Sequence, residues 1–112
     1  MAGNALAAPF FIPGTPTVGL TTAIPSPAAA VTIFAAGSIV NCADISNPPT
    51  ASGQGIGASE LLYVDMVTTA SATSPTSIPL SPGDRFPIRG PISTPVSVFA
   101  VTAGHKFIAV RY

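Results

Sequence analysis

The stretch from Thr76 to Tyr112, TSIPLSPGDRFPIRGPISTPVSVFAVTAGHKFIAVRY, decides the fold class. Apolar runs of strand length alternate in it with two turn sequences, SPGD at 81–84 and TAGH at 102–105. Apolar strands separated by short turns are typical of antiparallel sheets. The sequence therefore predicts that this end of the chain is antiparallel β, arranged as two hairpin-like units.

Glycine and proline give each of these turns its expected geometry. Pro82 has the φ that the second position of a type II turn needs, and Gly83 supplies the positive φ of the third position. Gly104 can take the left-handed conformation in the second turn. We therefore predict a short hairpin between Val96–Val101 and Lys106–Tyr112.

Composition limits the classes of protein to consider. The chain has 112 residues, of which 47% are hydrophobic and only 7% are charged, and its formal net charge is zero. An ordinary soluble domain carries about 25% charged residues, and near-zero charge favours association. The four basic residues are spread singly through 85–112, whereas phosphate binding needs clustered Lys and Arg. We expect a single-domain assembly component that does not bind nucleic acid.

The middle of the chain predicts further strands. Thirteen prolines and ten glycines argue against helices. Residues 28–36 and 38–46 are predicted to form a mostly buried pair of strands, and 47–57 a loop. In the strand predicted at 59–68, Leu62, Val64 and Met66 alternate with Tyr63 and Asp65, which indicates one buried face. The predicted fold is all-β, a small antiparallel β-sandwich formed by residues 28–112.

Edges and faces of this sandwich can also be predicted. Pro79 and Pro87 cannot donate to a ladder, so their short strands are expected to lie at sheet edges or to be irregular. In the last strands, Val96, Val98 and Ala100 lie on one side, and Phe99 and Val101 lie on the other. Both sides are apolar, so the side that faces away from the core needs a cover from another sheet, the N-terminal segment or a neighbouring subunit.

Residues 1–27 differ from the rest, because they carry no charge and hold five of the prolines. They are predicted to form an extended, Pro-rich N-terminal arm. A disordered tail is the alternative, but the large apolar side chains favour an arm that docks on another subunit. The residues expected to make this subunit or capsid interface are Phe10, Phe11, Ile12, Pro13, Val18 and Leu20.

Neither a membrane span nor a disulfide is expected. Residues 1–12 lack the basic region of a signal peptide, and the longest apolar run, 28–36, is far shorter than the roughly 18 residues of a spanning helix. Cys42 is the only cysteine, so it has no internal partner and is interpreted as a small buried thiol.

Groups for catalysis are scarce. His105 is expected to be an exposed polar residue of its turn. Glu60 and Asp65 are five residues apart on a strand, so they are predicted to lie on opposite faces and not to share a metal. Asp84 and Arg85 are predicted to cap a turn or form a salt bridge. We expect no enzyme activity and no cofactor or metal.

The order of segments carries a family resemblance. SIVNCADISNP (38–48) is followed by a Gly/Ser loop, LLYVDMV (61–67), SIPLSPGDRFPI (77–88) and PVSVFAVTAGHKFIAVRY (95–112). Over about residues 38–112 the chain resembles the small β-sandwich structural proteins of tailed bacteriophages. The arm departs from that pattern in being unusually apolar and Pro-rich.

The resemblance implies a virion protein that is made in the host cytoplasm and located on the capsid surface. It implies a capsid cement or decoration protein whose partners are the major capsid protein and copies of itself, as a homo-oligomer and possibly a trimer. A head-fibre or tail-associated module that binds a receptor or glycan is the alternative. That alternative ranks below the cement or decoration protein, because the sequence contains no Trp.

Overall fold

The computed structural model describes residues 17–18, 23–49 and 60–112. Every regular element within these ranges is a β-strand. The strands are β2 (Thr17–Val18), β3 (Val31–Phe34), β4 (Cys42–Ser46), β5 (Leu62–Asp65), β6 (Ile78–Leu80), β7 (Arg85–Arg89), β8 (Val96–Phe99) and β9 (Ile108–Arg111). No helix of the described residues has the length and hydropathy needed to cross a membrane.

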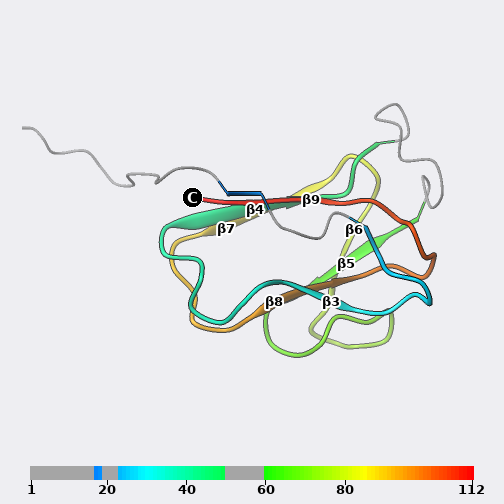
Figure 1. Ribbon diagram of the computed structural model, residues 1–112, viewed down its shortest axis with the longest axis horizontal. Helices are drawn as coiled ribbons and strands as arrows, with labels where there is room; N and C mark the ends of the chain where they lie inside the picture. The colour runs from blue at the N-terminus through cyan, green and yellow to red at the C-terminus, as the bar shows by residue number, and fades with distance from the viewer. Residues whose placement is uncertain (1–16, 19–22, 50–59) are drawn as a thin grey trace, which may run out of the picture.

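The strands form two four-stranded antiparallel sheets, in the orders β2–β9–β4–β7 and β3–β8–β5–β6. Figure 1 shows them as two layers, with β4, β7 and β9 in one and β3, β5 and β8 in the other. The prediction of a small antiparallel β-sandwich is confirmed.

The pairing follows one nested pattern. β5 pairs with β6, β4 with β7, β3 with β8 and β2 with β9, as if one long hairpin were folded over. Alternate pairs of this long hairpin fall in opposite sheets, and β4–β9 and β5–β8 contacts then close each sheet. This is the topology of a jelly roll.

The predicted hairpins are therefore wrong, although their turns are right. Gly83 and Gly104 have φ of 91° and 88°, and both turns close with a hydrogen bond between their first and last residues. However, β6 and β7 lie in different sheets, as do β8 and β9, and the predicted pair β3 and β4 is divided in the same way. Facing sheets lie only about 10 Å apart, so a short turn can pass between sheets as well as close a hairpin.

The core lies between the sheets and follows the predicted alternation. Leu62 and Val64 of β5 and Val96 and Val98 of β8 are fully buried, and Ile45 of β4 faces them from the other sheet. These β-branched and Leu side chains suit a pleated surface that is buried on one face. Each such side chain stabilises the fold by about 1.5–3 kcal/mol when it leaves water.

Pro79 lies on β6 and Pro87 on β7, each an edge strand of its sheet, which is one of the two predicted positions. Pro79 is opposite Tyr63, and Pro87 is opposite Asp44. A residue without an N–H is tolerated where that side of the strand faces solvent. Both prolines also hinder the addition of another strand to these edges.

The sandwich begins earlier than residue 28. Thr17 and Val18 pair with Arg111 and Val110 of β9, and Ala23 forms a bridge with Lys106. Ile24 is buried in the core. Part of the segment assigned to the arm therefore belongs to the folded body.

Candidate functional site

The predicted interface residues of the arm fall mostly outside the described residues. This applies to Phe10, Phe11, Ile12, Pro13 and Leu20. Val18 is placed by its backbone alone, as the partner of Val110 in β2. At this position the chain adds a strand to its own sheet.

The outer side of the β3–β8–β5–β6 sheet carries an apolar surface that we call the open face. It comprises Leu61, Tyr63, Pro79, Phe99 and Val101. Pro79, Tyr63 and Phe99 stand opposite one another across three neighbouring strands, and the rings of Tyr63 and Phe99 lie 6.4 Å apart. Val101 is 58% exposed and Leu61 38%. The predicted division of the last strands into a core side and an outer apolar side is confirmed.

The loop 66–77 is tied to the same outer side by the carboxylate of Asp65, at the end of β5. Asp65 is fully buried, although it points away from the core. Its oxygens accept hydrogen bonds of 2.7–3.3 Å from two backbone amides and four hydroxyl groups. The donors of this cage are Val67 N, Thr68 N, Thr68 Oγ1, Ser74 Oγ, Thr76 Oγ1 and Ser77 Oγ.

These donors keep the buried carboxyl ionised. Burial alone would raise the pKa of Asp65, but the hydrogen bonds from the Thr68 amide, the Thr76 hydroxyl, the Val67 amide and the Ser77 hydroxyl outweigh it and hold the pKa far below 3.8. These hydrogen bonds hold the loop 66–77 around the carboxylate. All the donors are neutral, so no positively charged side chain is needed.

A second buried polar network joins the two sheets. His105 is 0% exposed, so its predicted position as an exposed turn residue is wrong. Its Nε2 lies 2.9 Å from Asn47 Oδ1, just beyond β4, and its Nδ1 lies 3.3 Å from Glu60 Oε1, just before β5. The Thr102 hydroxyl donates to the other oxygen of Glu60. We call these four residues the His105 clamp.

Asn47 has the largest number of partners in the clamp. Its Nδ2 donates to the backbone carbonyls of Glu60 and Leu80, each at 2.9 Å. Its own carbonyl accepts from Gly83 N at 2.7 Å, and its N–H donates to Asp84 O at 3.0 Å. The side chain of Asn47 thereby links the end of β4 to the start of β5 and to β6, and its backbone links the same point to the turn before β7.

Glu60 and Asp65 do not come together. Asp65 is enclosed in its loop, and Glu60 contacts His105 at the other end of β5. No three His, Cys, Asp or Glu side chains among residues 17–18, 23–49 and 60–112 are placed to hold a metal ion. Asp84 caps its turn by accepting from Ser81 N, as predicted, whereas Arg85 pairs with Asp44.

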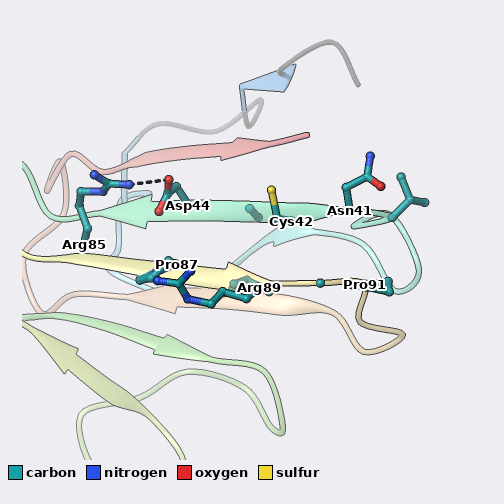
Figure 2. Close-up of a pocket in the computed structure, with 11 residues that line it drawn as sticks. Asn41, Cys42, Asp44, Arg85, Pro87, Arg89 and Pro91 are labelled. Carbon is teal, nitrogen blue, oxygen red and sulfur yellow. Dashed lines mark hydrogen bonds and ion pairs between the residues drawn. The ribbon is translucent and has the colours of Figure 1, made fainter. Parts of the chain in front are cut away.

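The outer side of the other sheet is hollowed by a groove of about 590 Å³ along β4 and β7. Figure 2 shows Asp44 and Arg85 joined at one end of the groove and Asn41 at the other. The Asp44–Arg85 distance is 2.7 Å, and Arg89 lies between these ends. Cys42, predicted as a buried thiol, lies half-buried in this groove.

Comparison with protein families, curated proteins and solved structures finds no match to the chain. The sequence did hold a signal for one network, because Asp65 is followed by a run of seven Ser and Thr residues within 68–77. Hydroxyl-rich loops of this kind offer donors to a nearby carboxylate. No local signal joins Asn47 to Glu60 and His105, which are 13 and 58 residues away.

Proposed function

We propose that the protein is a virion structural component, a capsid cement or decoration protein that bridges and stabilises major capsid subunits. The observation that carries this proposal is the jelly-roll strand order, joined to an N-terminal segment without charge. Jelly rolls recur in viral capsid proteins, and also in lectins and cupins. A fold does not by itself establish a function. The proposal therefore also rests on the apolar open face and on the N-terminal segment.

Two features suit a bridging role. The open face offers an uncharged apolar surface to a second copy or to the shell. Residues 1–16 precede β2 and carry Phe10, Phe11 and Ile12. An extended chain spans at most about 3.6 Å per residue, so sixteen residues reach at most about 58 Å, far enough to contact a neighbouring subunit.

The first experiment counts copies on the particle. Electron microscopy of the virion is expected to show many copies on the capsid surface, each contacting more than one capsid subunit. A few copies at a vertex or a tail tip would instead support the alternative of a fibre or tail module.

The second experiment tests the arm. Because Ile24 is in the core and Thr17 is in β2, the deletion must end at residue 16. Full-length protein and a deletion of residues 2–16 are added to shells that lack the protein, with Phe10→Ala/Phe11→Ala as a variant of full length. Burial of two Phe side chains is worth several kcal/mol, so both variants should lose at least about tenfold in occupancy. Equal occupancy would show that the segment is dispensable.

The groove along β4 and β7 is the one observation that supports the alternative function, a fibre or tail module that binds a receptor or glycan. Arg89, Asn41 and Asp44 place donors and acceptors around a hollow, which could bind a polar ligand such as a glycan. Among the described residues no aromatic side chain lines the groove, so this part of the chain offers no stacking surface on which a sugar ring could pack. Binding to a glycan panel that is lost in Arg89→Ala would favour this alternative.

A further inference from the structure

His105 occupies the point at which the two sheets and the N-terminal segment meet. Its ring contacts Asn47, which continues β4, and Glu60, which precedes β5. Its backbone carbonyl accepts from Ile24 N at 2.9 Å, and Gly104 N donates to Ile24 O at 2.8 Å. The turn that holds the ring is therefore also the surface on which Ile24 docks.

The partners of the ring determine how many protons it carries. Asn47 Nδ2 donates to two backbone carbonyls, so its Oδ1 is the atom that faces the ring, and Nε2 must be the donor to it. Nδ1 faces Glu60 Oε1, and an ionised carboxylate only accepts. Both ring nitrogens thus have an acceptor as partner, which is the pattern of an imidazolium.

Glu60 is suited to be that acceptor. Burial alone would raise its pKa, but the hydrogen bonds from Thr102 and His105 and the charge of His105 lower the pKa overall from 4.5. Two other charged residues lie nearby in the chain. Lys106 follows the ring and has an exposed side chain, and Asp84 accepts from Ser81 N in the turn beside Asn47.

We propose that His105 is held as a doubly protonated imidazolium, and that its charge fixes the Thr102–His105 turn on which Ala23 and Ile24 dock. Loss of the Nδ1 proton would place a lone pair of the fully buried ring against the Glu60 carboxylate, whose side chain is 24% exposed. A buried ring nitrogen without a hydrogen-bond partner is costly. The turn would then shift, and the two hydrogen bonds to Ile24 would weaken. Such a switch would operate in the isolated protein, whether or not the chain coats a capsid.

The charge state is tested first, without any substitution. Nitrogen-15 spectra of the full-length protein at neutral pH should show both ring nitrogens of His105 protonated. As the solution is made more alkaline, one nitrogen should lose its proton and the other should keep it. A ring with only one protonated nitrogen at neutral pH would overturn the assigned charge state.

The coupling is tested by hydrogen exchange at the amides of Ile24 and Gly104. Glu60→Gln keeps the shape of the side chain but removes its charge, so Nδ1 should become an acceptor for the new amide. The substitution removes the charged partner of a fully buried ring, so the protection of both amides should fall at least about tenfold. Asp44→Asn is the matched control, because it neutralises a carboxylate on the outer side of the other sheet.

The amides of Val64 and Val98 in the core separate local from global opening. They should keep their protection in Glu60→Gln if only the turn loosens. Should this variant fail to fold, the same four amides are followed in the wild-type protein as the ring loses its second proton. Unchanged protection at Ile24 and Gly104 when that proton leaves would refute the coupling.

Discussion

Asp65 and Glu60 lie at the two ends of β5, and both carboxylates accept hydrogen bonds, but their donors differ in kind and in position along the chain. The donors to Asp65 all come from 67–77, and every one is neutral. The donors to Glu60 are Thr102 and His105, more than forty residues away, and one of them is a titratable ring. The first arrangement shapes a loop, whereas the second holds distant parts of the chain together.

The difference shows how a chain with so few charges uses them. A buried carboxylate needs donors, and a Ser/Thr-rich loop supplies them locally without a counter-charge. Glu60 has fewer donors, both from the turn between β8 and β9, and Asn47 connects this turn to the end of β4. The loop around Asp65 and the junction around Glu60 should therefore respond differently to substitution.

The largest effect is expected at Asp65. Asp65→Ala leaves a group of hydroxyls and amides without their acceptor, and an unsatisfied buried network costs more than one lost hydrogen bond. The free energy of unfolding in urea should fall by about 3–5 kcal/mol. Thr73→Ala in the same loop, which does not contact Asp65, should change it by under about 0.5 kcal/mol. A loss under about 1 kcal/mol for Asp65→Ala would mean that the loop reorganises around other acceptors.

The next largest effect is expected at Asn47. Asn47→Asp keeps an acceptor for His105 but removes both donors, so the carbonyls of Glu60 and Leu80 lose their partner. The expected loss is about 2–4 kcal/mol in the free energy of unfolding, from one buried and one part-buried carbonyl left unsatisfied. Asn41→Asp in the outer groove is the control, and equal losses in the two variants would show that the Asn47 amide does not hold the two sheets together.

Much of the fold could be predicted because its signals are local. Alternation in Leu62–Asp65, the turns at Gly83 and Gly104, and the prolines of the edge strands each depend on a few neighbouring residues. The assignment of strands to sheets could not be predicted in this way. A four-residue turn fits both a hairpin and a crossing between sheets, and the choice depends on long-range pairing such as β4 with β7.

The candidate sites were harder to predict for the same reason. The outer apolar side of Phe99 and Val101 followed from the period of a strand. The burial of His105 did not, because a polar residue beside a turn glycine is usually exposed, and its partners Asn47 and Glu60 are supplied by the jelly-roll closure.

Acid should distinguish the two carboxylates by the size of their response. A carboxyl whose pKa is lowered in the folded state stabilises the protein fully above its unfolded-state pKa, and this contribution is lost as the pH falls through the folded-state value. The pKa of Asp65 is lowered much more than that of Glu60. Below about pH 4, the unfolding free energy of Asp65→Asn should therefore fall less steeply with pH than that of the wild type.

The measurement is a series of urea titrations from neutral to acid pH on Asp65→Asn, Glu60→Gln and the wild type. Glu60→Gln should also flatten the acid limb, but by less. Parallel curves for Asp65→Asn and the wild type would show that folding does not lower the pKa of Asp65.

The smallest effect is expected at the Asp44–Arg85 pair, which is shorter than the His105–Glu60 pair but has an exposed cation instead of a buried one. The two charged groups are 2.7 Å apart, yet the Arg85 side chain is 66% exposed, so water and salt screen their attraction. Asp44→Asn should therefore lower the free energy of unfolding by under about 1 kcal/mol, and most of that loss should vanish in 1 M salt. One oxygen of Asp44 is buried without a hydrogen-bond partner among the described residues, which further reduces what the carboxylate contributes. A loss above about 2 kcal/mol that persists in salt would place Asp44 with the buried Asp65, and the contrast between the exposed Arg85 and the buried His105 would then no longer matter.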